Sequence, residues 1–270
     1  MSRRVEDIAG YEVLTLAVQP CVAEVMALIG ADDLANVPGK GCWLACLNPH
    51  SYALALDDAQ FSRALQAADW LIPDGAGIVL ASRVLGGEIR HRVTGSDIFF
   101  GVLSELNRVG DASVFFLGST EETLAEIGKR MARDYPNVIV SGRYSPPFKA
   151  TYSQDELDEM VEAINTAAPD VLWVGMTAPK QEKWIAEMIG QLDVRFVAAI
   201  GAVFDFYAER VRRSHPIFQR LGLEWLPRLV QEPRRLWRRM FVSAPIFLWH
   251  VLLTRLGLDP GKSRSVKGDH

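Results

Sequence analysis

The chain has 270 residues, of which 49% are hydrophobic, so it can bury a full core as one large domain or as a domain with an appendage. Its formal net charge is −4, yet nine arginines and only two acids lie between Arg210 and Arg239, and such a block indicates an anionic partner: phosphate, membrane surface or nucleic acid. The composition excludes extensive disorder, and Met240–Leu253, interrupted by Pro245, is too short for the ~20 residues of a spanning helix.

Apolar runs and amphipathic stretches alternate along the chain. The expected strands are Trp43–Leu47, Asp69–Ile72, Ser113–Leu117, Val138–Ser141, Val171–Val174 and Phe196–Ile200. The expected helices are Tyr52–Ala67, Gly77–Leu85, Asp97–Arg108, Glu121–Tyr135, Gln154–Ala167 and Pro179–Gly190. Nearly all-apolar strands that alternate with helices are typical of a mostly parallel sheet covered by helices on both faces. We therefore predict a Rossmann-like α/β domain over residues 1–205.

The composition changes after residue 205. Residues 206–257 combine the arginines with tryptophan and phenylalanine in short helical stretches broken by prolines, which predicts a helical appendage. A basic face opposite an aromatic one is typical of a helix that lies on a membrane, although a hairpin packed on the domain fits equally well. Residues 258–270 are polar, and we expect them to form a disordered tail.

Polar and glycine-rich residues follow every expected strand. They are Asn48-Pro49-His50, Pro73-Asp74-Gly75, Gly118-Ser119-Thr120, Gly142-Arg143-Tyr144, Gly175-Met176-Thr177 and Gly201-Ala202. Ligands of such sheets bind beyond the carboxyl ends of the strands. A tight turn explains any single glycine, but six such turns on one edge favour a binding site there.

The stretch "LIPDGAGIVLASR" has the strand, Gly-x-Gly and helix of a nucleotide-binding turn, with an acid, Asp74, where phosphates would lie. It has Leu80 where a dinucleotide fingerprint has its third glycine, and the chain has no Walker lysine motif. Asp74 fits two roles at this position, a cap of the following helix or a catalytic base. In the second case Gly75 and Gly77 would leave room for a substrate beside it.

The stretch "RVTGSD" offers a second candidate element. Ser96 or Asp97 would cap the next helix, and Thr94, Gly95 and the helix N-terminus could receive a phosphate beside Arg92. The alternative is a surface arginine next to an ordinary cap.

In "APKQEKW", Lys180, Gln181 and Lys183 fall in the first turns of a helix. Lysines there oppose the helix dipole, which indicates an anion nearby. Trp184 at helical spacing is expected to pack in or beside the core.

No metal or cofactor is expected from the residues. Cys21, Cys42 and Cys46 lie in apolar surroundings and are predicted to be reduced rather than disulfide-bonded, and they do not have the spacing of a zinc site. The chain also contains no Asp-x-Asp, the motif with which many transferases hold a divalent ion.

The motifs together resemble one family. Asn48, the 73–77 turn, "RVTGSD", "APKQEKW", "GAVFDFYAERVRRSHP" and "GLEWLPRLVQEPRRLWRR" occur in the order seen in the WecG/TagA/CpsF family of bacterial glycosyltransferases, over Leu44 to Arg239. The resemblance implies metal-independent, inverting transfer of a sugar from a UDP-sugar to a polyprenyl-diphosphate-linked saccharide, in cell-surface polysaccharide synthesis. It also implies a peripheral location on the cytoplasmic face of the cytoplasmic membrane. N-acetylmannosamine, its uronic acid and glucose are sugars that family members transfer.

The resemblance also assigns roles to residues. Asp74 matches the family's proposed base, Arg92 an arginine that acts on the donor diphosphate or the acceptor, and Asn48 and Gln181 polar pocket residues. The basic appendage residues that it implies, thought to complete the site on an anionic membrane, are Arg228, Arg235 and Arg238. Cys46 stands where some members have threonine, so a hydroxyl contact there is in doubt.

The chemistry suits these residues. Inverting transfer needs a base for the acceptor hydroxyl, which Asp74 can supply, and arginines suit the charge that develops on the leaving diphosphate. Two rivals stay open: a nucleotide- or nucleic-acid-binding module that uses the arginine block, and a metal-independent α/β enzyme acting on a soluble nucleotide-sugar. The leading hypothesis needs no nucleic acid, and it allows a homo-oligomer because apolar appendage surface could bury itself in a dimer.

Overall fold

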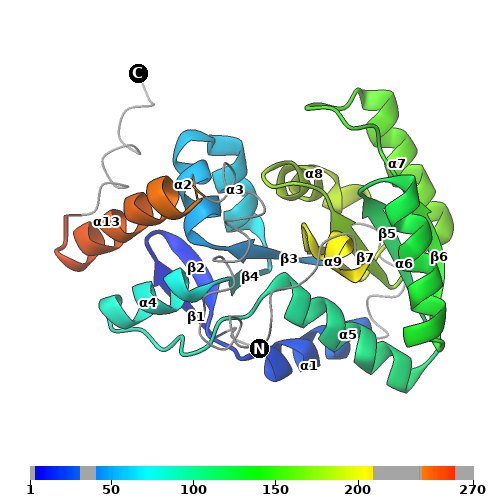
Figure 1. Cartoon of the computed structure of the whole chain (residues 1–270), viewed down its shortest axis with the longest axis horizontal. Coiled ribbons are helices and arrows are strands. Elements are labelled where there is room, and N and C mark those ends of the chain that lie inside the picture. The colour runs from blue at the N-terminus through cyan, green and yellow to red at the C-terminus, as the bar shows by residue number, and fades with distance from the viewer. Residues whose placement is uncertain (1–3, 31–40, 209–236, 238, 259–270) are drawn as a thin grey trace.

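A parallel six-stranded sheet forms the centre of the molecule, in a computed structural model that describes residues 4–30, 41–208, 237 and 239–258 (Figure 1). Its strands are β3 (Cys42–Leu47), β4 (Trp70–Pro73), β5 (Ala112–Gly118), β6 (Val138–Tyr144), β7 (Val171–Gly175) and β8 (Phe196–Ala199). Their order across the sheet is β4-β3-β8-β7-β5-β6, and every neighbouring pair is parallel. The predicted α/β class and all six strands are confirmed, with boundaries that differ by a few residues at most.

Helices connect these strands and lie on both faces of the sheet (Figure 1). They are α2 (Pro49–Asp57), α3 (Ala59–Ala67), α4 (Ala76–Leu85), α5 (Gly95–Val109), α6 (Glu121–Asp134), α7 (Gln154–Ala167), α8 (Lys180–Met188), followed by the 3₁₀ turn η2 (Ile189–Gln191), and α9 (Val203–Tyr207). The single helix predicted over Tyr52–Ala67 is wrong. Asp58 has extended backbone angles and its side chain accepts from the Phe61 N–H, so one helix ends there and a capped second one begins.

The first thirty residues contain elements that the sequence analysis did not predict. Strands β1 (Val5–Ile8) and β2 (Tyr11–Leu14) form an antiparallel hairpin outside the main sheet, and α1 (Val18–Ile29) follows. The hairpin turns at Ala9-Gly10, where both residues have positive φ. Its strands have four residues each, too few for a clear alternating pattern, so packing rather than local pattern defines them.

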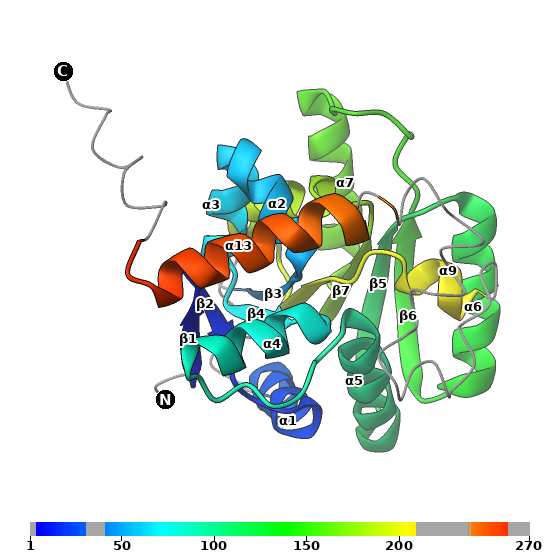
Figure 2. The same ribbon diagram turned by 60° about the vertical axis from the view of Figure 1, so that its left-hand side comes forward.

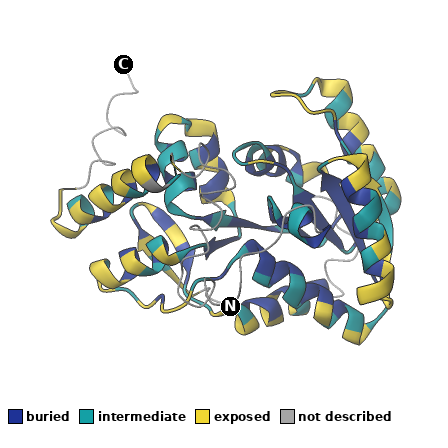
Figure 3. Ribbon diagram, viewed as in Figure 1, coloured by how far each residue is buried: buried dark blue, intermediate teal, exposed yellow. Residues whose placement is uncertain are grey.

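The core lies in two layers, one on each face of the sheet. Trp43 and Leu47 belong to one layer, whereas Leu44 lies in the other with Trp173 and Phe196. Successive strand residues thus alternate between two buried faces, which is why the strands are almost entirely apolar. Figure 3 shows the central strands of the sheet buried and most exposed residues on the outer sides of the helices, while the edge strand β6 is partly exposed.

The end of the described chain returns to the body of the molecule. The π-helical turn η3 (Arg239–Ser243) leads into α13 (Ala244–Arg255), which packs against α2 and α4 (Figure 2). Phe247 and Val251 are fully buried in this contact. The described part of the predicted appendage is therefore helical. The boundaries 1–205, 206–257 and 258–270 stay predictions, and nearly all of the expected tail lies outside the described residues.

Candidate active site

Asn48 and Asp74 meet at the carboxyl edge of β3 and β4. Leu47 pairs with Pro73 in the sheet, and the Asp74 N–H donates to the Leu47 carbonyl oxygen at 2.8 Å, so the residues that leave the two strands are neighbours. Asn48 Nδ2 donates to Asp74 Oδ2 at 3.3 Å. The sheet register, rather than proximity in sequence, thus forms this pair.

The rest of the Asn48 side chain caps α2. Its Oδ1 accepts from the His50 and Ser51 N–H groups at 3.0 and 2.9 Å, and Ser51 Oγ accepts from the Asn48 N–H in return, which completes a capping box. Because the cap fixes the amide oxygen, the amide nitrogen must point toward Asp74. Asn48 is therefore held in place by local structure.

Asp74 does not cap a helix, so the capping alternative is wrong. The N-cap of α4 is Gly75, whose φ is +106°, and no side chain bonds to this helix start. A Cβ on Gly77 would lie 2.4 Å from Pro49 Cγ, so only glycine lets α4 begin this close to α2. The two glycines thus shape the turn and leave the Asp74 carboxylate for another role.

Opposing effects act on the pKa of Asp74. Burial raises it, and this is the largest effect; the Asn48 hydrogen bond and the positive charges of Arg92 and Arg239 lower it, while Asp97 raises it further. The net pKa lies above the ordinary value of 3.8. A carboxylate with a raised pKa is a stronger base, and a base works best when its pKa approaches the working pH.

The start of α5 differs from expectation. Thr94 is the N-cap, not Ser96 or Asp97: Thr94 Oγ1 accepts from the Asp97 N–H, and Asp97 Oδ2 accepts from the Thr94 N–H at 2.9 Å. Asp97 fits the third helical position of a capping box, which decides the assignment. A phosphate would compete with this carboxylate, so recognition by Thr94 and Gly95 stays a prediction.

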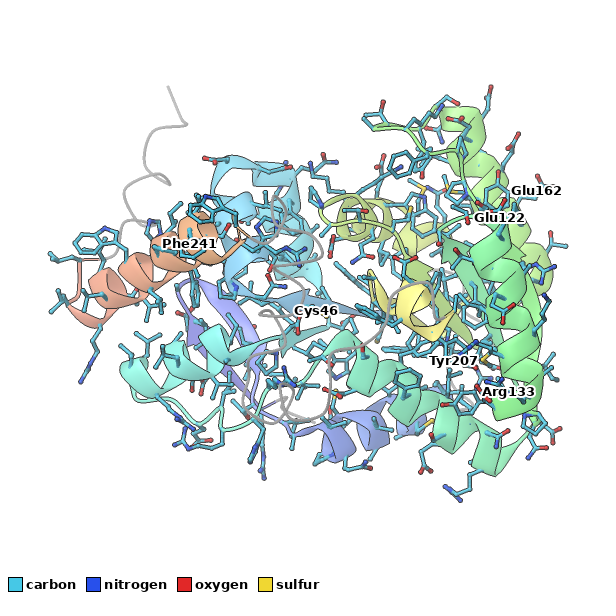
Figure 4. All side chains as sticks on the ribbon, viewed as in Figure 1. Cys46, Glu122, Arg133, Glu162, Tyr207 and Phe241 are labelled. Atoms are coloured by element: carbon cyan, nitrogen blue, oxygen red, sulfur yellow. The ribbon has the colours of Figure 1, made fainter. Side chains whose placement is uncertain are left out.

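Gly95 lies where the start of α5 comes close to β3 and to the residue that follows β8. A Cβ there would lie 3.4 Å from Ile200 Cα and 3.5 Å from Cys46 Sγ. Cys46 Sγ in turn lies 3.8 Å from the Ala199 carbonyl oxygen, to which it donates, and Figure 4 places Cys46 near the centre of the molecule. Burial raises the Cys46 pKa well above 9.0, with Asp74 the next contributor, so the thiol stays neutral beside the candidate base.

Gln181 lies beneath the same edge, 4% exposed. Its Oε1 accepts from the Gly201 N–H at 3.1 Å and its Nε2 donates to Glu182 Oε1 at 2.9 Å. It thus joins α8 to the turn after β8, and its matching of a family pocket residue stays a prediction.

The two lysines of this helix start have partners inside the protein. Lys183 forms an ion pair with Asp58, so the anion expected near the helix start is, for this lysine, a protein carboxylate. Lys180 Nζ donates to the Lys149 carbonyl oxygen at 2.6 Å and lies 4.0 Å from the centre of the Tyr152 ring. Trp184 is buried, as predicted.

The C-terminal segment reaches the site through α2. His50 Nδ1 shares a hydrogen bond of 3.0 Å with Ser243 Oγ, and the Tyr52 hydroxyl shares one of 2.9 Å with His250 Nδ1. The Tyr52 ring also contacts Phe247 edge-on at 5.0 Å. Both α2 residues follow closely on Asn48, so docking of α13 occurs next to the Asn48–Asp74 pair.

This docking explains the effect of Arg239 on Asp74. Arg239 begins η3, and its positive charge lowers the pKa of Asp74 although 165 positions separate the two in the numbering. Sequence reasoning missed it, because Arg239 is one of nine arginines in a uniform basic block. The three appendage arginines that the resemblance implied, Arg228, Arg235 and Arg238, lie outside the described residues.

The C-terminal helices also expose a large apolar surface. Its members on or next to η3 and α13 are Trp237, Phe241, Val242, Ile246, Leu248, Trp249, Leu252, Leu256 and Leu258. Leu80 and Val84 of the adjoining α4 are exposed as well. We call this set the apolar face; Figure 4 marks Phe241 at its start. None of the helices that the structure describes has the length and hydropathy to cross a bilayer.

The described ranges contain no group of three or more His, Cys, Asp and Glu side chains that could hold a metal ion. The three cysteines are free, as predicted. The polar groups gathered at the edge therefore offer an acid–base residue, Asp74, and cations from two parts of the chain, Arg92 and Arg239.

Comparison with known proteins gives one consistent result. A family model described as "Glycosyl transferase WecG/TagA/CpsF family" matches residues 7–260. The chain is similar to N-acetylglucosaminyldiphosphoundecaprenol N-acetyl-beta-D-mannosaminyltransferases, with 30% identity over 213 residues to that of Bacillus spizizenii, covering 79% of each chain. The Bacillus subtilis enzyme is 28% identical over 212 residues (78% of this chain, 79% of the relative). A Staphylococcus aureus enzyme is 27% identical over 228 residues (84% and 86%).

Proposed function

Because the chain belongs to the WecG/TagA/CpsF family and is a glycosyltransferase of cell-surface polysaccharide synthesis, we propose that it transfers N-acetylmannosamine from its UDP derivative to N-acetylglucosaminyl-diphospho-undecaprenol. The names of its relatives support this sugar over the uronic acid and glucose. They also support an acceptor sugar linked to a polyprenyl diphosphate. The transfer inverts the anomeric centre in a single in-line displacement.

The observation that carries the proposal is the Asn48–Asp74 pair. Asp74 takes the proton of the acceptor hydroxyl as that oxygen attacks the anomeric carbon and the bond to UDP breaks. Asn48 donates to one carboxylate oxygen and orients the group, while the other oxygen is left for the substrate hydroxyl. The raised pKa strengthens this base, and the nearby arginines favour its ionised form.

The leaving diphosphate needs positive charge in the transition state. Among the described arginines we assign this role to Arg92, whereas Arg239 of the C-terminal segment acts on the ionisation of Asp74. The proposal includes independence of divalent metal. Turnover that survives EDTA treatment would support it, and loss of turnover with recovery on adding Mg²⁺ or Mn²⁺ would contradict it.

The apolar face suggests how a soluble donor and a lipid acceptor meet. Its tryptophan, phenylalanine and leucine side chains on a helix beside the site suit the interfacial layer of a bilayer. We propose that the protein binds peripherally to the cytoplasmic face of the cytoplasmic membrane, with α13 against the lipid. The polyprenyl tail would then remain in the bilayer while the acceptor sugar reaches Asp74.

A donor and acceptor panel tests the function. Three donors, UDP-N-acetylmannosamine, UDP-N-acetylmannosaminuronic acid and UDP-glucose, are each offered with lipid-diphosphate-linked N-acetylglucosamine or glucose. The release of UDP is measured. We expect release with UDP-N-acetylmannosamine and the N-acetylglucosamine acceptor only. Release with another donor–acceptor pair would give the chain a different donor or acceptor specificity within the family. Release with none of the pairs would contradict the proposed transfer.

The nucleic-acid alternative depends on arginines that lie mostly outside the described residues. Family membership favours the transferase. Binding to anionic liposomes but not to RNA would agree with it, whereas salt-sensitive RNA binding without liposome binding would favour the alternative.

A further inference from the structure

A buried acid next to the site has no role in the chemistry above. Glu182, in the first turn of α8, is 3% exposed. Its Oε1 accepts from Gln181 Nε2 at 2.9 Å, while its Oε2 is buried and has no hydrogen-bond partner among the described residues. A carboxyl group is costly to bury in this way, so its presence here needs an explanation.

Glu182 fixes the orientation of Gln181. The Gln181 amide receives the Gly201 N–H on its oxygen and donates from its nitrogen to the carboxyl, so a flipped amide would lose both bonds. Gly201, with φ of +59°, opens the turn from β8 to α9. Its neighbour Ile200 lies close to the start of α5, where a Cβ on Gly95 would be 3.4 Å from Ile200 Cα. The carboxyl therefore supports the edge of the sheet through Gln181.

The lysines nearest in sequence do not neutralise Glu182. Lys183 is paired with Asp58, and Lys180 is engaged by the Lys149 carbonyl oxygen and the Tyr152 ring. The helix start itself favours an ionised acid. Burial nevertheless outweighs this effect and raises the pKa of Glu182 to about 7, with the Gln181 hydrogen bond acting in the opposite direction.

The elements packed against α8 add little charge. Strand β8 and the turn η2 contain no titratable residue, and α3 brings only the exposed Arg63 besides its cap Asp58. On the side of the site lies the Cys46 thiol, whose pKa is raised by Asp74, Glu182 and Asp97 in that order after burial. An ionised Glu182 would thus add a third negative charge beneath an edge whose two carboxylates, Asp74 and Asp97, already face the cations of Arg92 and Arg239.

We propose that Glu182 is a positioning residue whose carboxyl is neutral when the anionic nucleotide-sugar donor is bound: it orients Gln181 and the Gly201 turn, and its ionised fraction takes up a proton as the donor binds. This inference rests on the proposed donor. The proton comes from solvent and adds to the carboxylate; no bond of the donor changes.

Thermodynamic linkage between proton binding at Glu182 and donor binding determines the direction of the pH effect. The negative charge of a diphosphate bound at this edge disfavours the ionised form of Glu182 and raises its pKa further, so donor binding takes up protons around pH 7. The reciprocal effect is weaker donor binding at higher pH. If the coupling is on the order of half to one pKa unit, the uptake is about 0.3–0.4 proton per donor at pH 7, and the affinity is lower by about threefold to eightfold at pH 8.5 than at pH 5.5.

Titration calorimetry tests this. Binding of UDP-N-acetylmannosamine, whose diphosphate diester has no proton that titrates near neutrality, is measured at one pH in two buffers of different ionisation enthalpy. We expect the full-length wild type to take up a fraction of a proton and Glu182→Gln to lose the share that Glu182 contributes. Glu182→Met, an apolar side chain of similar length, serves if the glutamine variant does not fold.

Glu187→Gln is the matched control, because Glu187 is an exposed acid on the same helix. It should match the wild type in proton uptake and affinity. Equal uptake in wild type and Glu182 variants, or binding without uptake in the wild type, overturns the role of Glu182 and leaves the proposed donor standing. No binding of the donor at any pH overturns both.

Discussion

The strand edge and the C-terminal segment act on the same carboxylate in different ways. At the strand edge, sheet register and the α2 capping box hold Asn48 against Asp74, so the pair is built into the core of the domain. The C-terminal segment contributes Arg239 through η3 and α13, whose docking includes the His50–Ser243 and Tyr52–His250 hydrogen bonds and the buried Phe247 and Val251. The position of Asp74, the proposed base, is therefore fixed by the fold, whereas its pKa depends in part on docking.

The largest expected effect on turnover comes from a substitution at the strand edge. Asp74→Asn removes the base and should lower turnover by about 100-fold or more, because general base catalysis contributes on the order of 10²–10⁴. UDP release is the measurement, with circular dichroism and thermal unfolding to verify the fold. Asp57→Asn, which changes an exposed aspartate at the end of α2, should leave turnover unchanged. A folded Asp74→Asn variant of near-normal turnover would remove Asp74 from the mechanism.

The docked helix should show the next largest effect. Phe247 is fully buried against Tyr52, and phenylalanine-to-alanine changes in a core cost about 3–5 kcal/mol. In Phe247→Ala this cost falls on docking, so we expect turnover to drop about tenfold or more while the unfolding temperature of the α/β domain changes little. Limited proteolysis should cut near α13 more readily.

Leu248→Ala is the control for that change, since Leu248 is exposed on the same helix. With a short-chain, water-soluble acceptor, which removes any need for membrane, it should resemble the wild type. Full turnover of Phe247→Ala with this acceptor would show that the base works without the docked helix.

Arg239→Gln should have the smallest effect, one that depends on pH. The Arg239 cation lowers the pKa of Asp74, so its removal raises that pKa, and a higher pH is then needed to ionise the base. The acid limb of the rate profile should move to higher pH, with turnover several-fold lower below the limb and nearly equal above it.

Arg239→Lys should restore the acid limb, because it keeps the charge. Arg255→Gln removes an equally positive, exposed residue from the last turn of α13 and should not move it. If the acid limb of the rate profile does not move in Arg239→Gln, the docked C-terminal segment shapes the site but its charge does not affect the ionisation of Asp74.

Several features could be predicted because their causes are local. All-apolar strands followed by glycine and polar residues predicted the parallel sheet and the edge that carries Asn48 and Asp74. Other features depended on competition between neighbours that a pattern does not reveal. Asp58 divides the helix after β3 because its side chain caps a new one, and Thr94 wins over two other cap candidates because Asp97 completes a capping box with it.

The sequence by itself determined the family, the α/β class and the place of Asp74 at the carboxyl edge of the sheet, since strand period and turn chemistry act over a few residues. Only the tertiary structure decided that Gly75 leaves Asp74 uncapped, that one arginine of the basic block, Arg239, acts on it, and that Glu182 is buried. The physical reason is that charge, burial and pKa depend on which distant segments pack together. In a linear pattern Glu182 is an ordinary acid in the first turn of a helix; three-dimensional packing makes it a buried one with a pKa of about 7.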